Sequence, residues 1–279
     1  MARVTGRLVL VATPIGNLGD ITARAIETLQ QCDVICCEDT RHSSKLFQRF
    51  GIAEKRLIIV NDHTEHDSRE EIVALVAAGK TVALVTDAGS PGISDPGERL
   101  VKAIVESGGV VSATPGPSAA VMAVSLSGLP SSRWVFEGFL PRSGAERTER
   151  LEAVAVELRT VVMYEAPHRL HRTLIDLESM CGAQRRIVVA AELTKVHEHL
   201  WRGNLHDATR HFAGDDLRGE FVLVLDGAAP AAPPTDDEII AALRAEIAAG
   251  VSRKDAASRV SARLGVAKRH VYELTLSLG

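Results

Sequence analysis

The chain has 279 residues, a length that suits two compact domains better than one small module. Hydrophobic residues make up 46% and charged residues 24%, which is typical of a globular protein and excludes a disordered chain. The formal net charge is -4 and aromatic residues are only 4%, so the chain is not a general polyanion binder and any nucleic-acid contact needs a local basic patch. No stretch approaches 18 consecutive apolar residues, which argues against a membrane span.

The first 116 residues alternate apolar strand patterns with amphipathic helix patterns. Strands are expected at residues 7–13, 34–38, 56–61, 81–86 and 110–113, and helices at 23–32, 40–50, 72–78 and 98–107. Ser68 and Glu71 have the spacing of a capping box ahead of the third helix. Continuous apolar strands separated by helices predict a parallel sheet that is covered on both faces.

The pattern changes after residue 117. A helix rich in small residues is followed by expected strands at 134–140, 161–165, 187–193, 197–202 and 220–226. The third and fourth of these are too close for a parallel crossover, so the sequence predicts an α/β domain with a mixed sheet. Residues 227–235 are a Pro/Ala-rich linker, and helices are expected at 236–249, 252–264 and 267–278. The predicted organisation is therefore two α/β domains, 1–116 and 117–226, and a helical extension over 236–279.

Three predicted loops rich in Gly, Pro and Ser follow strands of the first domain, at 13–17, 87–97 and 114–118. In an open parallel sheet, ligands bind beyond the carboxyl ends of the strands, and glycine lets the backbone approach a ligand closely. Tight turns would explain one such loop, whereas three at corresponding positions favour a binding site. Neither GxGxxG nor GxxxxGK[ST] occurs, which argues against a dinucleotide or triphosphate. S-adenosylmethionine (SAM) would suit the cleft, although these features do not single it out.

Polar side chains follow several predicted strands. Glu38, Asp39 and Arg41 end the second strand, where they could orient a substrate, act as a base or simply decorate a helix N-terminus. Glu192 and Lys195 end a strand of the second domain, where they mark either a return to solvent or a wall of the cleft.

The spacing of the histidines and cysteines does not match a known metal-binding motif. The segments His63–His66 and His197–His199 match neither HExxH nor a zinc-finger spacing, so we interpret both as solvated loop residues. Cys32, Cys36, Cys37 and Cys181 form no CxxC pair, which indicates reduced thiols of a cytosolic protein. No metal is expected.

The last 29 residues hold six basic residues against two acidic ones, and their two helices fit a helix-turn-helix. Arg253, Lys254, Lys268 and Arg269 could therefore contact nucleic-acid phosphates. The alternative is a small helical subdomain, or a dimer contact, with a solvated basic face.

An ordered set of motifs spans residues 7 to 226. The segments are TPIGNLGDIT (13–22), CEDTRHS (37–43), TDAGSPGISDPG (86–97), PGPSA (115–119), SGLP (127–130), FEGFLPR (136–142), YEAPHRL (164–170), AELTKVHE (191–198) and GEFVLVL (219–225). Together they resemble the ribosomal RNA small subunit methyltransferase I family, of the tetrapyrrole methylase fold. The resemblance implies two α/β domains around a SAM cleft, a cytoplasmic homodimer, and 2′-O-methylation of a cytidine ribose in 16S rRNA of the small ribosomal subunit.

The resemblance also implies site residues. The SAM-binding set would be Pro14, Ile15, Gly16, Asn17, Asp87, Ala88, Gly89, Ser90, Pro91, Ile93, Pro115, Gly116, Ser118 and Ala119, with Tyr164 and Ala191 on the second-domain wall. Tetrapyrrole-modifying relatives have Gly-Asp-Pro after the fourth strand, whereas this chain has Asp87-Ala88-Gly89-Ser90-Pro91, which favours the RNA branch. A ribose hydroxyl is a weak acid and needs a nearby base or cation. We expect Lys195 or Glu192, helped by Glu38, Asp39 or Arg41, to line the ribose side.

Two other functions stay open at this point. One is a tetrapyrrole C-methyltransferase of the same fold. The other is a non-catalytic regulator that binds a small nucleoside in the cleft and nucleic acid through its tail.

Overall fold

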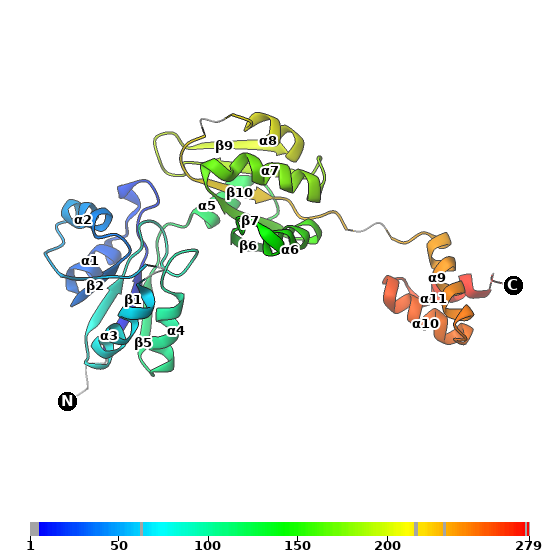
Figure 1. Ribbon diagram of the computed structural model, residues 1–279, viewed down its shortest axis with the longest axis horizontal. Helices are drawn as coiled ribbons and strands as arrows, with labels where there is room; N and C mark the ends of the chain where they lie inside the picture. Colours follow the sequence, from blue (N-terminus) through cyan, green and yellow to red (C-terminus); the bar gives the residue numbers. More distant parts are fainter. Residues whose placement is uncertain (1–5, 62–63, 215–216, 231–232, 277, 279) are drawn as a thin grey trace. The chain divides into compact units, whose positions relative to one another are not determined.

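The computed structural model describes residues 6–61, 64–214, 217–230, 233–276 and 278. The chain forms two compact units, Met1–Ala228 and Ala229–Gly279. Within the described residues, the first unit holds two five-stranded sheets with their helices, and the second unit is helical (Figure 1). The finer division of the first unit at residues 116 and 117, and the linker over 227–235, stay predictions.

The first sheet is parallel throughout. Its strands are β1 (Arg7–Val11), β2 (Val34–Cys37), β3 (Arg56–Ile59), β4 (Thr81–Leu84) and β5 (Val110–Thr114). They lie in the order β3-β2-β4-β1-β5. This order makes β4, β1 and β5 neighbours, so the loops that follow these three strands leave the same edge of the sheet side by side.

Helices cover both faces of the first sheet, as the continuous apolar strands predicted. Side chains alternate along β1, so Leu8 packs in the cluster that holds helices α3 (Glu65–Ala77) and α4 (Glu98–Glu106). Val9 and Val11 face the opposite way, toward α1 (Ala23–Gln31) and α2 (Thr40–Arg49). The side chain of Thr22 caps α1 by accepting a hydrogen bond from the N–H of Ala25.

The start of α3 differs from the sequence prediction. The helix begins at Glu65, and Ser68 lies inside it, where its hydroxyl donates to the carbonyl of Thr64, so the predicted capping box is wrong. Glu65 is buried, 5% exposed, and its carboxylate accepts from the N–H groups of Gly97 (3.2 Å) and Leu100 (3.0 Å) at the start of α4. The interpretation of this residue as a solvated loop residue is therefore wrong as well. His66 is exposed, and His63 lies outside the described residues.

The second sheet is mixed, as predicted. Its strands are β6 (Trp134–Phe139), β7 (Thr160–Glu165), β8 (Arg186–Ala191), β9 (His199–Asn204) and β10 (Phe221–Leu225). The order is β6-β7-β10-β8-β9, with only the β6–β7 pair parallel. The predicted antiparallel pairing of β8 with β9 is confirmed.

Two hydrophobic clusters flank the second sheet. Helices α6 (Gly144–Val156), α7 (Pro167–Cys181) and α8 (Leu205–His211) contribute to the cluster on one face. Helix α5 (Ala119–Ser127) contributes to the cluster on the other face. That second cluster also includes Ile15, from the loop after β1 of the first sheet. The loops of the first sheet are thereby packed against the second sheet.

The second unit contains α9 (Asp236–Ala248), α10 (Arg253–Leu264) and α11 (Lys268–Leu276) around a small apolar core. Thr235 and Glu238 form a capping box at the start of α9. Gly265 ends α10 in the left-handed conformation with φ of 65°, which gives the predicted turn between the last two helices. In the part of the chain that the structure describes, no helix has the length and apolarity that crossing a membrane requires.

Candidate functional site

The three Gly/Pro-rich loops meet at the carboxyl edge of the first sheet. Thr13 and Gly89 form an antiparallel bridge between two of them, with N–H to carbonyl distances of 2.8 Å and 3.1 Å. Gly89 has a φ of +75°, a conformation that favours glycine. Since backbone bonds tie the loops after β1 and β4 together, these two loops form one braced wall rather than separate turns.

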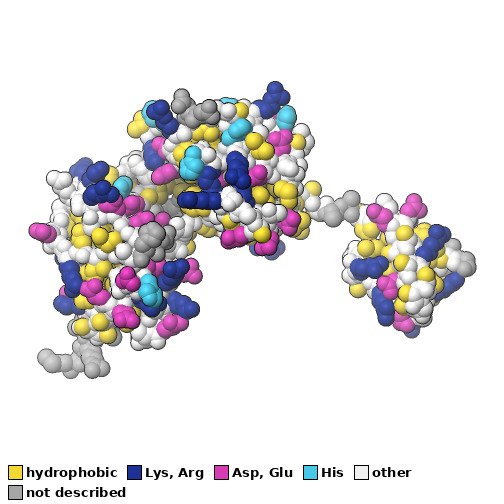
Figure 2. All heavy atoms as spheres, in the orientation of Figure 1, with side chains coloured by type: hydrophobic (Ala, Val, Ile, Leu, Met, Phe, Trp, Pro, Cys, Tyr) yellow, Lys and Arg dark blue, Asp and Glu magenta, His cyan; other side chains and the backbone are white. Residues whose placement is uncertain are grey.

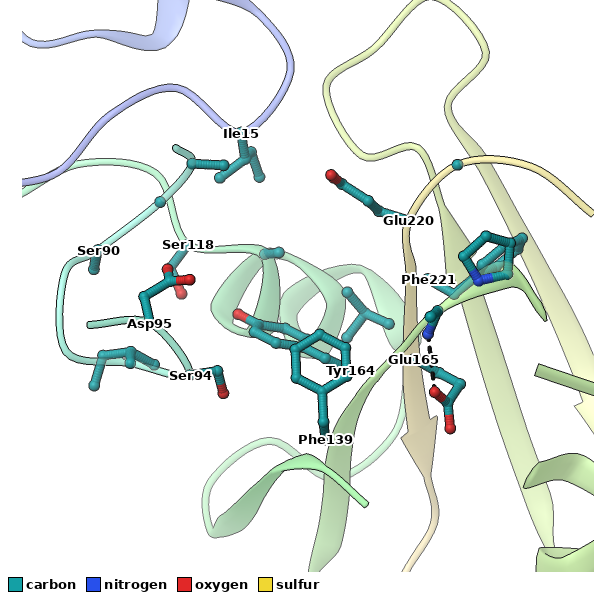
Figure 3. Close-up of a pocket in the computed structure, with 18 residues that line it drawn as sticks. Ile15, Ser90, Ser94, Asp95, Ser118, Phe139, Tyr164, Glu165, Glu220 and Phe221 are labelled. Atoms are coloured by element: carbon teal, nitrogen blue, oxygen red, sulfur yellow. Dashed lines mark hydrogen bonds between the residues drawn. The ribbon is translucent and has the colours of Figure 1, made fainter. Parts of the chain in front are cut away.

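A cavity of about 280 Å³ lies between these loops and the second sheet, close to the lower end of the range of small-molecule pockets. We call it the loop cavity. Its lining residues are Ile15, Ala88, Gly89, Ser90, Ile93, Ser94, Asp95, Ser118, Ala119, Phe139, Tyr164, Glu165, Ala166, Pro167, Gly219, Glu220, Phe221 and Val222. In Figure 3, Ile15, Ser90, Asp95 and Ser118 lie on one side, and Glu220 and Phe221 on the other.

Tyr164 joins the two sides of the cavity. Its hydroxyl accepts a hydrogen bond from the N–H of Ala120 at 3.3 Å, and its ring meets Phe136 and Phe139 edge to face. Burial raises the pKa of the Tyr164 hydroxyl above its ordinary value, so this group stays neutral near pH 7. The aromatic cluster gives the cavity an apolar floor with one polar atom.

The structure brings about half of the predicted cofactor-binding residues to this cavity. Those that line it are Ile15, Ala88, Gly89, Ser90, Ile93, Ser118, Ala119 and Tyr164. Those that do not line it are Pro14, Gly16, Asn17, Asp87, Pro91, Pro115, Gly116 and Ala191. Pro14 and Asp87 instead line a neighbouring cavity of about 220 Å³, together with His42 and Lys45. Their roles stay predictions.

Sequence reasoning missed the contribution of β10 and of the loop before it. Gly219, Glu220 and Phe221 line the loop cavity. They belong to the quoted motif GEFVLVL, and the signal that could have found them is a charged residue directly before a fully apolar strand. The pairing of β10 between β7 and β8 places that residue at the cavity, and no spacing in the sequence predicts this pairing.

Lys195 links two carboxylates at the edge of the cavity. Its Nζ lies 2.8 Å from Oε1 of Glu192 and 3.2 Å from Oε2 of Glu220, and its side chain is 28% exposed. Glu192 and Thr194 have positive φ values of 53° and 67°, an uncommon conformation for non-glycine residues. This strained turn holds the ammonium beside a residue that lines the cavity.

The ion pairs fix the charge of this cluster. Burial of Lys195 opposes its charge, but the bonds to Glu192 and Glu220 together outweigh burial and raise the pKa of the ammonium above its ordinary value. The hydrogen bond from Lys195 is the main cause of a lowered pKa at Glu192. At neutral pH the cluster therefore presents a cation held between two carboxylates, and Lys195 is protonated.

The predicted helpers at the end of β2 lie elsewhere. Asp39 caps α2 and pairs with Arg41 at 2.7 Å, and the Arg41 side chain is 88% exposed. The side-chain bond to Arg41 lowers the pKa of Asp39 to about 2. Glu38 accepts a long hydrogen bond of 3.5 Å from the N–H of Asp87. None of the three lines the loop cavity, and their proposed part in catalysis stays a prediction.

Three buried polar atoms at the strand ends have no partner among the described residues. They are Oδ1 of Asp87 after β4, Oγ1 of Thr114 at the end of β5, and Oγ1 of Thr194 after β8. Buried polar groups are nearly always hydrogen-bonded, so each of these oxygens keeps capacity for one more hydrogen bond. Within the described ranges, no group of three His, Cys, Asp or Glu residues could hold a metal ion.

At Gly16, the loop after β1 lies very close to the turn of the second sheet that holds Lys195. A Cβ at this position would overlap Cγ of Lys195 and lie 2.9 Å from Oγ1 of Thr194 and 3.0 Å from the carbonyl oxygen of Leu193. We expect Gly16→Ala to displace the turn that holds Lys195 and to reduce kcat/KM for the activity of this site by about tenfold to a hundredfold. Gly214→Ala, where a Cβ meets nothing within 4 Å, is the matched control. Steady-state kinetics on both variants check this, and equal activity would contradict the contact's importance.

The predicted RNA-binding residues of the second unit are exposed. Arg269 pairs with Glu273 at 3.0 Å, and Arg253 donates to the carbonyl of Leu278 at 3.2 Å. The side chains of Lys254 and Lys268 make no hydrogen bond or ion pair with the residues that the structure describes. The role of these four residues stays a prediction.

Comparison with known proteins agrees with this arrangement. The family description of tetrapyrrole (corrin/porphyrin) methylases matches residues 7–209. The chain is 46% identical to "Ribosomal RNA small subunit methyltransferase I" of Synechocystis sp. over 98% of both chains. It is 41% identical to the protein of the same name from Escherichia coli O157:H7, over 97% of this chain and 95% of that one.

Solved structures show the same fold. A diphthine synthase has a TM-score of 0.61 at 15% identity, over 79% of this chain and 90% of that one. A uroporphyrin-III C-methyltransferase from Thermus thermophilus, solved in complex with S-adenosyl homocysteine, has a TM-score of 0.55 at 17% identity over 79% and 96% of the two chains.

Fold and family together define the chain as a SAM-dependent methyltransferase of the tetrapyrrole methylase class. Within that class, it belongs to the ribosomal RNA small subunit methyltransferase I family. The fold class, the enzyme class and the family resemblance predicted from the sequence are confirmed.

Proposed function

We propose that this chain transfers a methyl group from SAM to the 2′-oxygen of a cytidine ribose in 16S rRNA of the small ribosomal subunit. The observation that carries the proposal is the protonated Lys195 between Glu192 and Glu220, at the edge of the loop cavity. A ribose hydroxyl gains negative charge as it attacks, and a fixed ammonium stabilises that charge. The relatives named for small-subunit rRNA methylation support the choice of substrate.

The residues of the loop cavity fit SAM. Ile15, Phe139 and Phe221 offer apolar contact for an adenine ring, and Ser90 and Ser118 offer hydroxyl groups. The unpartnered oxygens of Asp87, Thr114 and Thr194 lie at strand ends outside the cavity lining. When bound, SAM supplies an electrophilic methyl group on a good leaving group, so the protein does not need to protonate what leaves.

The charged cluster has a distinct role at the ribose. Glu192 accepts from both Lys195 and the N–H of Glu220, which fixes Glu192 and aligns the ammonium. Glu220 lines the cavity and is exposed, so its carboxylate is placed to receive the hydroxyl proton. In this mechanism Lys195 acts as a cation and Glu220 as the proton acceptor.

We propose that the enzyme is a cytoplasmic homodimer. Exposed apolar side chains on the first unit, such as Val105 on α4, Val110 on β5 and Val121 on α5, offer apolar surface to a partner subunit. In addition, β5 is an edge strand of the first sheet. Sedimentation of the purified chain, compared with a Val121→Glu variant, tests this. A monomeric wild-type chain contradicts it.

Small ribosomal subunits from cells that lack this protein are the substrate for the decisive test. They are incubated with the purified chain and methyl-labelled SAM, and the digested RNA is analysed by mass spectrometry. Label on 2′-O-methylcytidine is the expected result. Absence of label in RNA, with SAM binding confirmed separately, overturns the proposal. Label on a tetrapyrrole precursor would then identify a C-methyltransferase, and SAM binding without turnover on either substrate would identify a regulator.

A further inference from the structure

A second cavity, of about 250 Å³, lies beside the first turns of α7. We call it the arginine pocket, and its lining residues are Arg142, Arg147, His168, Arg169, Arg172 and Thr173. Pro167, the first residue of α7, lines the loop cavity, whereas His168, the next residue, lines the arginine pocket. Consecutive residues at the start of α7 therefore line the two cavities.

Two of the arginines in this pocket are structural. Arg147 is buried and bonds to Asp176 (2.7 Å), to Thr173 (3.0 Å) and to the carbonyl of Pro141 (2.8 Å). Arg169 pairs with the buried Glu165 at 3.1 Å. Each of these guanidinium groups has its own carboxylate, so the floor of the pocket is rigid and its charges are balanced.

The three remaining basic side chains are not balanced. Arg142, His168 and Arg172 are exposed, and none of their side chains forms a hydrogen bond or ion pair with any residue in the described ranges. The carboxylates nearest in the network, Glu165 and Asp176, are already bonded to the floor arginines. Arginines gathered around one cavity repel each other unless an anion lies between them, and their forked donors match phosphate oxygens. Figure 2 shows Lys and Arg side chains gathered near His side chains on the face of the first unit that carries α7.

The first turn of α7 adds to the attraction for an anion. The helix has 15 residues and begins with proline, which lacks an N–H. The partial positive charge of a helix N-terminus lies in this first turn, which contributes His168 to the pocket. The start of α7 and the side chains of Arg142 and Arg172 therefore all add positive potential near the pocket.

We propose that the arginine pocket binds a backbone phosphate of the RNA substrate, next to the nucleotide whose ribose is held at the edge of the loop cavity. This inference rests on the proposed function, because it takes RNA as the substrate. A backbone phosphate is favoured over a free one because neighbouring residues of α7 line the two cavities, so one RNA strand can reach the pocket and the edge of the loop cavity together. Phosphate contacts set the position of a nucleic acid without reading its sequence.

The test uses a double variant that carries both Arg142→Gln and Arg172→Gln. Its activity on small subunits is compared with that of the wild-type enzyme. We expect KM for the subunits to rise about tenfold and the dependence of log KM on log salt concentration to become shallower. The reason is that binding releases fewer counterions from the RNA when the protein makes fewer phosphate contacts. The dissociation constant for SAM and the melting temperature are expected to stay unchanged. The combined variant Arg142→Lys with Arg172→Lys keeps the charges and should recover part of the affinity, which a merely structural role would not predict.

A matched control removes the same charge elsewhere. Arg7, at the amino end of β1, and Lys102, on α4, are both exposed, and Arg7→Gln with Lys102→Gln changes the net charge equally. If both double variants raise KM alike, the effect is one of general charge and the pocket assignment is overturned. An unchanged KM in the arginine variant also overturns it.

Two further measurements separate the sources of phosphate and the two proposals. If inorganic phosphate raises the melting temperature of the wild type but not of the arginine variant, while KM for subunits is unchanged, the pocket takes free phosphate and the RNA inference fails. Filter binding of the subunits without SAM tests the pocket independently of methylation. Weaker binding by the variant supports the pocket even if no methyl transfer occurs, and equal binding contradicts it.

Discussion

Lys195→Ala is expected to reduce kcat for methyl transfer by about a hundredfold to a thousandfold, the range seen when one preorganised stabiliser of developing charge is removed. The ammonium lies 2.8 Å from Glu192 and 3.2 Å from Glu220. Its loss removes the cation and leaves two carboxylates that repel each other. Single-turnover assays on small subunits, with SAM binding measured separately, check this expectation.

The pH dependence distinguishes a cation from a base at this position. Because the pKa of Lys195 is raised, a stabilising ammonium persists through neutral pH and is lost only as the pH rises through that raised value. If Lys195 were instead the base, activity would increase steadily with pH toward that value. Lys102→Ala, on the exposed face of α4, is the control and should keep wild-type turnover. Wild-type kcat in a folded Lys195→Ala variant would refute the assignment.

Glu65→Ala is expected to lower the free energy of unfolding by about 2–3 kcal/mol. The substitution removes two charge-assisted hydrogen bonds and leaves the N–H groups of Gly97 and Leu100 buried without an acceptor. It also frees the start of α4, which follows the loop that lines the loop cavity. Urea unfolding followed by circular dichroism measures the change.

Glu70→Ala is the matched control for this prediction. Glu70 lies in the same helix but is exposed, and surface substitutions of this kind usually change stability by less than about 0.5 kcal/mol. Glu65→Gln keeps one acceptor oxygen and should fall between the two variants. If Glu65→Ala were as stable as Glu70→Ala, the buried carboxylate would not hold α4 in place.

The positions of most elements follow from local patterns. The strand predicted at 34–38 is β2, the helix predicted at 98–107 is α4, and the strand predicted at 220–226 is β10, each within two residues. Apolar periodicity carries this information because burial on one or two faces requires it. The start of α3 was misplaced because Glu65 looks like a polar loop residue, and only the packing of α3 beside α4 gives its carboxylate two backbone donors.

The sequence by itself determined the fold class, the family and the three loops that form one wall of the loop cavity. These depend on residue types at short spacing, where glycine, proline and apolar periodicity act locally. Only the tertiary structure decided which charged residues meet. It separated Asp39 and Arg41 from the loop cavity, placed Glu220 there, and gathered Arg142 and Arg172 beside the first turn of α7. The reason is that strand order and pairing, which bring distant residues together, arise from the global packing of both sheets and are not encoded at any one position.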